Sequence, residues 1–259
     1  MMNPPIRDWS GLRVWVVGAS TGIGAQTARL LLARGAHVTI TARSRVRLEQ
    51  VAPTQERLLI APADVTDAAT LAIAHAAACS RWGGIDLTLI VAGTHDEMRA
   101  SDFDVGRARA LFDVNVMGVF ECVALVLPAL LGSPGAAGRG IAIVGSVAAY
   151  SGLPRALTYG ASKAAILNFT ESLYFDLHPH GIGVYLVSPG FVDTPLTQQN
   201  TFPMPALMSA RDAAIALVSG LERGDFDIHF PKRFTRVLKL LRLLPYWLYF
   251  ALIRRITGL

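Results

Sequence analysis

The chain has 259 residues, of which 52% are hydrophobic and 17% charged, so it can bury a substantial core, which excludes disorder as its dominant state. Its two cysteines, Cys79 and Cys122, exclude a disulfide framework and a CxxC zinc site, and they fit a reducing compartment. The net charge of +5 arises at the end of the chain: residues 232–259 hold seven basic and no acidic residues, whereas the other 231 hold 17 basic and 19 acidic ones, which argues against a nucleic-acid-binding body.

The start of the chain carries no targeting pattern. Its first eight residues contain no apolar run after a basic start, so we expect no signal peptide and a cytoplasmic protein. The inner face of a membrane is a further expected location if the basic C-terminal residues bind lipid.

Short apolar runs rich in β-branched residues alternate with helical patterns along the chain. Residues 12–17 predict a buried strand, and residues 25–33 predict a helix ended by Gly35. Further strands are expected at 37–41, 57–61, 87–91, 141–144, 184–187 and 226–230. Strands that are apolar on both faces and alternate with helices belong to a parallel sheet covered on both sides.

This pattern predicts the fold class and the domain organisation. We find no repeat, low-complexity block or linker before residue 231. We therefore expect an α/β fold, a single doubly wound parallel sheet (Rossmann fold) with helices on both faces, over residues 1–231. Residues 232–259 form a basic, amphipathic C-terminal extension.

A glycine-rich turn lies between the first strand and the first helix. Gly18, Gly22 and Gly24 follow a GxxxGxG spacing, which allows a tight turn and the close approach of a pyrophosphate to the helix N-terminus. Three glycines at a fixed spacing are common by chance, so the position between strand and helix carries the prediction.

The end of the second strand bears on the choice of cofactor. An acidic residue there would accept hydrogen bonds from the adenosine ribose, but this chain has Arg43 and Arg45 instead. The two arginines favour NADP(H), with Arg43 as the first candidate for a 2′-phosphate contact and Arg45 as the second. NAD(H) remains possible, because the same arginines could be solvated at the start of a surface helix.

Tyr159 and Lys163 are four residues apart, on one face of a predicted helix. A neighbouring ammonium stabilises a phenolate, so we expect Lys163 to lower the pKa of Tyr159 and to prepare it for proton transfer. Lys163 is the sole lysine before residue 232 in a chain with 21 arginines, which indicates that a compact ammonium is required there. The alternative is an ordinary surface pair.

The order of these motifs resembles the classical short-chain dehydrogenase/reductases. The likeness covers roughly residues 10–231. It is carried by Gly18-x3-Gly22-x-Gly24, Asp64, Asn115, Ser146, Tyr159-x3-Lys163 and Ser188-Pro189-Gly190.

The resemblance implies a catalytic role for four residues. Tyr159 would be the general acid/base, and Lys163 would tune it while binding the nicotinamide ribose. Ser146 would hydrogen-bond the substrate oxygen. Asn115 would hold a water that links Lys163 to solvent.

The resemblance also implies a cofactor site, with Asp64 at the adenine ring and Thr194 at the nicotinamide carboxamide. Together with Arg43, the expected cofactor-binding residues are Gly18, Ser20, Thr21, Gly22, Ile23, Gly24, Asp64, Val65, Ala92, Gly93, Tyr159, Lys163, Pro189, Gly190, Val192 and Thr194. We expect no metal, and we interpret His178 and His180 as exposed polar residues.

One segment departs from the family pattern. The family usually has Asn-Asn-Ala-Gly after its fourth strand, whereas this chain has Ile90-Val91-Ala92-Gly93. Ala92 and Gly93 still permit a close approach to the cofactor. The asparagine side chains that usually brace the sheet are missing, which bears on stability or cofactor positioning and leaves the catalytic assignment unchanged.

The resemblance makes the segment after Gly190 a flexible lid over the substrate. Its large apolar residues are Phe191, Leu196, Phe202, Met204, Leu207 and Met208. They indicate a hydrophobic or lipid-like substrate, and the alternative is that the same residues only pack the closed lid.

The C-terminal extension combines an apolar stripe and a basic stripe at helical spacing. Its apolar run of eleven residues, 243–253, contains Pro245 and is too short to span a bilayer. Two interpretations are open: a helix lying in an anionic membrane interface, or a tail packed on the body or on another subunit.

These features predict an NADP(H)-dependent oxidoreductase that interconverts a ketone and a secondary alcohol, and they favour neither direction of the reaction. Ketone reduction needs a hydride donor, and a proton donor with a second hydrogen bond at the oxygen, which Tyr159 and Ser146 can supply. The alternatives are an NAD(H)-dependent alcohol dehydrogenase and a non-catalytic cofactor-sensing or scaffold protein. We expect a small hydrophobic substrate and a homo-oligomer, and no nucleic-acid partner.

Overall fold

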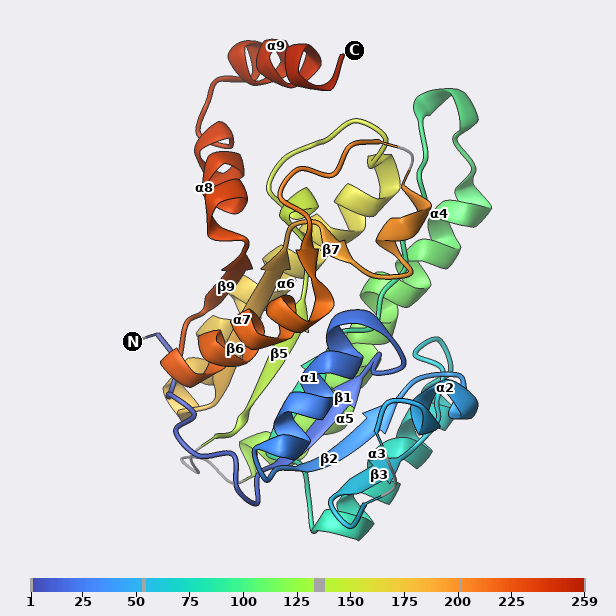
Figure 1. The fold of residues 1–259 in the computed structure, drawn as a ribbon, viewed down its shortest axis with the longest axis vertical. Helices are drawn as coiled ribbons and strands as arrows, with labels where there is room; N and C mark the ends of the chain where they lie inside the picture. The colour runs from blue at the N-terminus through green and yellow to red at the C-terminus, as the bar shows by residue number, and fades with distance from the viewer. Residues whose placement is uncertain (1, 53–54, 133–137, 201, 259) are drawn as a thin grey trace.

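A computed structural model describes residues 2–52, 55–132, 138–200 and 202–258. Within these residues, one sheet contains parallel strands in the order β3-β2-β1-β4-β5-β6-β9 (Figure 1). The strands are β1 (Arg13–Val17), β2 (His37–Thr41), β3 (Leu58–Ile60), β4 (Leu87–Ile90), β5 (Gly140–Val144), β6 (Gly183–Pro189) and β9 (Asp227–Phe230).

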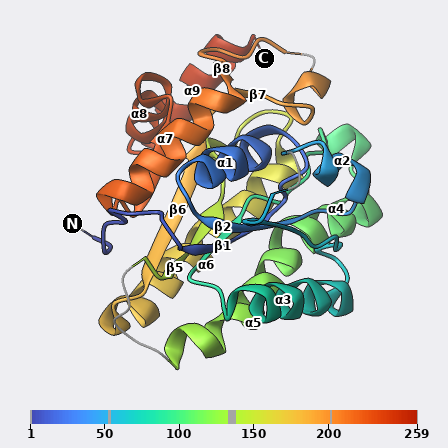
Figure 2. The ribbon, with the colours of Figure 1, turned by 60° about the horizontal axis from the view of Figure 1, so that its bottom comes forward.

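Helices cover both faces of this sheet, as Figure 2 shows. One apolar core joins the sheet to α1 (Gly22–Ala33) and α7 (Ala210–Arg223). The other joins it to α3 (Ala68–Trp82), α5 (Gly118–Leu131) and α6 (Leu157–Leu177). The remaining elements are α2 (Arg45–Glu49), α4 (Val105–Phe112), α8 (Lys232–Leu241), α9 (Tyr246–Thr257) and the short parallel pair β7 (Val192–Asp193) and β8 (Met208–Ser209).

The predicted doubly wound parallel sheet is therefore confirmed. Every residue of β4, β5 and β6 is buried, as expected for strands with a helical layer on each face. The bounds differ by a few residues at element ends. The helix expected at 25–33 begins at Gly22, because Thr21 already has the extended backbone of an N-cap residue.

The strand order places a crevice above the centre of the sheet. The chain runs from β1 outward to β2 and β3, then returns to add β4 on the other side of β1. At such a reversal, the loops after β1 and β4 diverge at the carboxyl ends of the strands, which is where open α/β sheets bind ligands.

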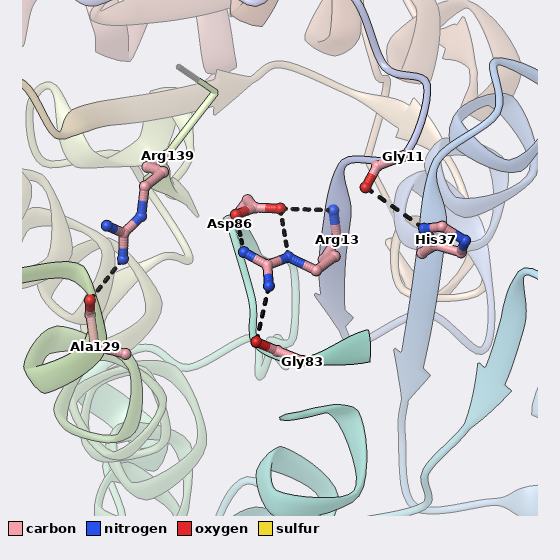
Figure 3. Close-up of polar contacts among 7 residues, drawn as sticks. All are labelled: Gly11, Arg13, His37, Gly83, Asp86, Ala129 and Arg139. Atoms are coloured by element: carbon pink, nitrogen blue, oxygen red, sulfur yellow. Dashed lines mark hydrogen bonds and ion pairs between the residues drawn. The ribbon is translucent and has the colours of Figure 1, made fainter. Parts of the chain in front are cut away.

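An ion pair lies at the amino ends of two central strands, at the other end of the strands from the crevice (Figure 3). The Arg13 guanidinium donates to both carboxylate oxygens of Asp86, with Nε–Oδ2 at 2.8 Å and Nη2–Oδ1 at 2.5 Å. It also donates to the Gly83 carbonyl at 2.8 Å. Since Arg13 begins β1 and Asp86 immediately precedes β4, this contact joins the two central strands far from the crevice.

One helical run, Val105–Leu131, is long and apolar enough by length and composition to cross a membrane. It comprises α4, a π-helical segment (Asp113–Met117) and α5. Its α5 residues Val119, Cys122, Val123 and Val126 are buried in the core that also contains α3 and α6. The apolar side chains of α5 therefore pack in the protein core.

Candidate active site

The glycine-rich turn brings the backbone of two strand ends together. Gly18 has φ +91°, and a Cβ there would lie 2.4 Å from the Ala92 nitrogen. A Cβ on Gly24 would lie 2.3 Å from the Gly18 carbonyl oxygen. Only glycine permits both approaches, which pack the start of α1 against the turn.

The N-terminus of α1 suits an anion. Thr21 occupies the N-cap position, but its side chain makes no capping hydrogen bond, and the first turn contains no acidic residue. The amides of this turn therefore have no side-chain partner from the cap, and Gly22 and Ile23 line the cleft, an arrangement that favours a phosphate group. The turn thus fits the pyrophosphate of a dinucleotide.

A cleft of about 500 Å³ opens from this turn across the carboxyl ends of the strands. Most of the predicted site residues line it: Gly18, Ser20, Thr21, Gly22, Ile23, Arg43, Asp64, Val65, Ala92, Gly93, Ser146, Tyr159, Lys163, Pro189, Gly190, Val192 and Thr194. Gly24 and Asn115 do not line the cleft. They lie behind it, where Gly24 packs on the turn and Asn115 is fully buried.

The arginines after β2 separate into two groups. Arg43 lines the cleft, and so does Arg47, four residues later. The predicted contact of Arg43 with a 2′-phosphate remains a prediction. Arg45 is not part of the lining and instead lies 3.8 Å from Glu49, one turn along α2. Arg47 was missed as a candidate, because Arg43 precedes the N-cap residue Ser44 and helical spacing therefore does not relate the two arginines.

The Tyr159 and Lys163 side chains meet at the inner end of the cleft. The Lys163 Nζ lies 5.9 Å from the centre of the Tyr159 ring and donates a hydrogen bond to the Val144 carbonyl at 3.1 Å. Lys163 is 5% exposed, and burial lowers the pKa of its ammonium to about 8. Val144 ends β5, so a single hydrogen bond ties α6 to the sheet at this point.

Ser146 follows β5 and faces the same phenol. Its Oγ accepts a hydrogen bond from the Ala148 amide at 3.1 Å, which leaves the hydroxyl hydrogen available as a donor. Burial raises the pKa of Tyr159, and a side-chain hydrogen bond with Ser146 acts in the opposite direction. The expected net lowering of the tyrosine pKa is therefore not produced by the protein's own groups, because the cost of burying the phenolate prevails.

Asn115 sits in the π-helical segment between α4 and α5. Its Oδ1 accepts from the Thr94 amide at 2.8 Å, and its Nδ2 donates to the Thr94 carbonyl at 3.0 Å and to Ser162 Oγ at 3.1 Å. The side chain thus braces the segment after β4, where the family's usual asparagines are replaced. Its predicted contact with a water remains a prediction.

His95 is a site neighbour that the sequence did not indicate. Its ring packs edge-on against Tyr159, with the ring centroids 4.7 Å apart. Burial lowers the pKa of His95, against a smaller opposing effect of Glu97 and Asp96, so the imidazole is neutral at pH 7. No motif marks this position, because the contact depends on how the loop after β4 folds over α6.

The first part of the predicted lid contributes to the lining of the cleft. Thr194, Pro195, Leu196, Thr197 and Gln199 line the cleft. The ring of Phe191 contacts Phe202 at 5.9 Å and also Phe234 of α8 at 5.7 Å between centroids. The lid is thereby joined to the C-terminal helices. Among the described residues, no group of three or more His, Cys, Asp or Glu side chains could hold a metal ion.

Comparisons with known proteins agree with this geometry. Residues 13–203 match the family model described as short chain dehydrogenase. An uncharacterized oxidoreductase of Myxococcus xanthus is 33% identical over 246 residues, covering 93% of this chain and 96% of the relative. An uncharacterized oxidoreductase of Staphylococcus epidermidis is 32% identical over 207 residues, covering 80% of this chain and 89% of the relative.

A solved structure is similar over nearly the whole chain. It is a short chain dehydrogenase from Burkholderia cenocepacia J2315, determined in complex with NADP. Its TM-score is 0.81 at 29% identity, and the match covers 95% of this chain and 98% of the other.

Proposed function

This chain belongs to the short-chain dehydrogenase/reductase family of oxidoreductases, and we propose that it interconverts a ketone and a secondary alcohol with NADP(H). The observation that carries the proposal is the meeting of Ser146, Tyr159 and Lys163 at the inner end of a cleft that begins at an anion-accepting helix N-terminus. When bound, NADP(H) supplies or accepts the hydride.

The protein groups act on the oxygen of the substrate. Tyr159 gives its hydroxyl proton to the oxygen during reduction and takes it back during oxidation. Ser146 donates a second hydrogen bond to the same oxygen, since its Oγ accepts from the Ala148 amide and its hydroxyl hydrogen stays free to donate. Lys163 holds positive charge beside the phenol, which favours the phenolate that remains after proton transfer.

Two features support NADP(H) over NAD(H). Arg43 and Arg47 both line the cleft where the adenosine ribose would lie, and among the residues that the structure describes none with an acidic side chain lines it at that end of β2. Arginine pairs well with a phosphate, and the missing carboxylate removes the usual partner of a free ribose hydroxyl. The NADP bound by the Burkholderia protein is consistent with this preference.

The apolar lid supports a hydrophobic substrate. Phe191 and Phe202 pack together in it, and Leu196 lines the cleft. Such a surface favours a ketone with a large apolar group, including a lipid-like one. An assembly of identical chains remains a prediction, which light scattering of the purified protein tests.

The experiment is a screen of ketones and secondary alcohols with each of the four nicotinamide cofactors, followed at 340 nm. We expect NADPH-dependent reduction, faster with apolar ketones than with small polar ones. Turnover with NADH alone would support the NAD(H)-dependent alternative. Tight cofactor binding without turnover of any substrate would support the sensing or scaffold alternative.

A further inference from the structure

The two C-terminal helices, α8 and α9, stand at the carboxyl end of the sheet, beside the lid (Figures 1 and 2). The inner side of α8 is fixed to the body. Thr235 is buried, and its Oγ1 lies 2.6 Å from His229 Nδ1. Lys239 forms an ion pair with Asp227, and Phe234 contacts Phe191 of the lid. These contacts pack α8 against β9 and against the start of the lid.

The inner side of α9 is fixed to the catalytic loop. The Tyr249 hydroxyl donates a hydrogen bond to the Gly152 carbonyl at 2.8 Å, and Ile253, one turn later, is also buried. Gly152 lies in the chain between Ser146 and Tyr159. The position of α9 is thus set by the segment that connects the two groups expected to contact the substrate oxygen.

The outer side of both helices exposes large apolar side chains. Tyr246 and Trp247 are 79% and 73% exposed, Leu243 is 78% exposed, and the rings of Tyr246 and Phe250 stack at 5.7 Å. We call this surface the arm face, and its apolar members are Val237, Leu240, Leu243, Tyr246, Trp247, Phe250 and Ile256. Seven large apolar side chains exposed within residues 237–256 are more than the isolated apolar residues of an ordinary surface, and such a concentration marks an interaction site.

Exposed basic side chains lie on the same C-terminal segment as the arm face. They are Lys232, Arg233, Arg236, Arg242, Arg254 and Arg255, all exposed. Within the residues that the structure describes, none of the six forms an ion pair. The segment 232–259 contains no acidic residue. Their positive charge is therefore uncompensated by the protein, whose other 231 residues carry a small negative charge.

We propose that the arm face binds the surface of an anionic lipid bilayer and so turns the lid and the mouth of the cleft toward the lipid. Exposed Trp and Tyr rings suit the headgroup region, Leu and Phe reach the acyl boundary, and the arginines pair with anionic headgroups. A second copy of the chain fits less well. A symmetric pairing would bring the same uncompensated positive charge onto itself.

The consequence for the substrate rests on the proposed function. An apolar ketone dissolved in the bilayer would reach the lid without crossing water. The lid and α9 stand on the same side of the molecule, and the contacts of Phe191 and Tyr249 hold both in place.

Co-sedimentation of the full chain with vesicles tests the surface. We expect binding to phosphatidylcholine vesicles containing phosphatidylglycerol, weaker binding in high salt, and little binding to phosphatidylcholine alone. The double variant Trp247→Ser/Phe250→Ser should lose at least about tenfold in partitioning. The matched control is Ile73→Ser/Phe175→Ser, which changes two exposed apolar residues on α3 and α6 and should bind normally.

Trp247 supplies a second measurement. Of the four tryptophans, Trp9 and Trp15 are buried and Trp82 is partly buried, whereas Trp247 is exposed. Anionic vesicles should therefore shift the emission to shorter wavelength. Trp247→Phe should abolish the shift while most of the binding remains.

Three results would overturn the proposal: no binding to anionic vesicles at low salt, equal binding of the arm variant and its control, or binding without a change in Trp247 emission. Light scattering that shows the Trp247→Ser/Phe250→Ser variant, but not its control, losing an oligomer would assign the face to a second copy instead.

Tyr159→Phe should bind vesicles like the unaltered protein. Vesicle binding without reductase activity would therefore reject the proposed function alone, and activity on soluble ketones without vesicle binding would reject the arm surface alone.

Discussion

The Lys163 ammonium nitrogen lies 5.9 Å from the centre of the Tyr159 ring, and both side chains project from the first two turns of α6. The lysine is held there by the Val144 carbonyl rather than by a carboxylate. Its charge is therefore available to the phenol and to whatever binds beside it.

Tyr159→Phe removes the transferable proton and nearly preserves the shape of the side chain. Turnover with NADPH and a ketone should fall by about 10² or more, with little change in NADPH affinity. Stopped-flow and fluorescence titration measure the two quantities separately. Near-normal turnover would remove Tyr159 from the proposed mechanism.

The pH dependence of reduction should follow Lys163. Burial lowers its pKa to about 8, so the ammonium is present below that pH and is lost above it. We expect kcat/KM to decline as pH rises through about 8. In Lys163→Arg, which stays charged, this decline should disappear even though the overall rate is lower. An unchanged pH profile in this variant would show that another group titrates.

Arg43→Ala and Arg47→Ala should each weaken NADPH binding by about ten- to a hundredfold and leave NADH nearly unchanged, because only NADPH carries the 2′-phosphate. Arg45→Ala is the matched control, since this side chain pairs with Glu49 outside the cleft. Calorimetric titration with both cofactors measures the difference. Equal losses for NADPH and NADH would place these arginines elsewhere.

His95→Ala removes the ring that packs against Tyr159, whereas His95→Phe keeps a ring there. A ring contact of this kind is worth about 0.5–1.5 kcal/mol, so the alanine variant should lose about three- to tenfold in kcat and the phenylalanine variant little. The neutral imidazole makes phenylalanine a fair replacement at pH 7. A comparable loss in both variants would indicate a polar role for His95. Thermal midpoints distinguish either result from a general loss of stability.

Asp86→Asn should destabilise the fold by about 1–3 kcal/mol at pH 7, since Arg13 keeps its place but loses its charged partner. Burial acts to raise the pKa of Asp86, but the hydrogen bonds from Arg13 outweigh it and hold the pKa below its usual value. The contribution of the carboxylate is thus complete above about pH 4 and is lost as pH falls through the folded pKa.

Urea unfolding at several pH values checks this prediction. The gap between the unaltered protein and Asp86→Asn should stay constant from pH 7 to about pH 5 and shrink in more acidic solution. A gap that widens on acidification would contradict the sign. Activity of the folded variant should be retained, because the pair lies at the amino ends of β1 and β4, whereas the cleft lies at the carboxyl ends of the strands.

Sequence reasoning was most successful where the chain's local pattern reflects its surroundings. The strands could be predicted because a sheet buried on both faces requires continuous apolar runs, as in Gly140–Val144. The Tyr159 and Lys163 pair could be predicted because the helical period alone puts them on one face.

The contacts that were missed depend on tertiary structure. His95 meets Tyr159 only because the loop after β4 folds over α6, and Arg45 turns to Glu49 while Arg47 turns to the cleft. The sign of the Tyr159 pKa shift was also missed, because it depends on how deeply the phenol is buried. Sequence spacing carries none of these quantities.

The ring of Phe191 touches Phe202 within the lid and Phe234 on α8. If the lid sets substrate preference, as proposed, α8 should contribute to that preference through Phe234. A chimera that takes only residues 191–209 from a relative would set a foreign side chain against Phe234, whereas one that also takes residues 232–241 would transplant both partners. The two segments should therefore be exchanged together when the enzyme is engineered. The residues at positions 191 and 234 should also covary among relatives, because their side chains are in contact.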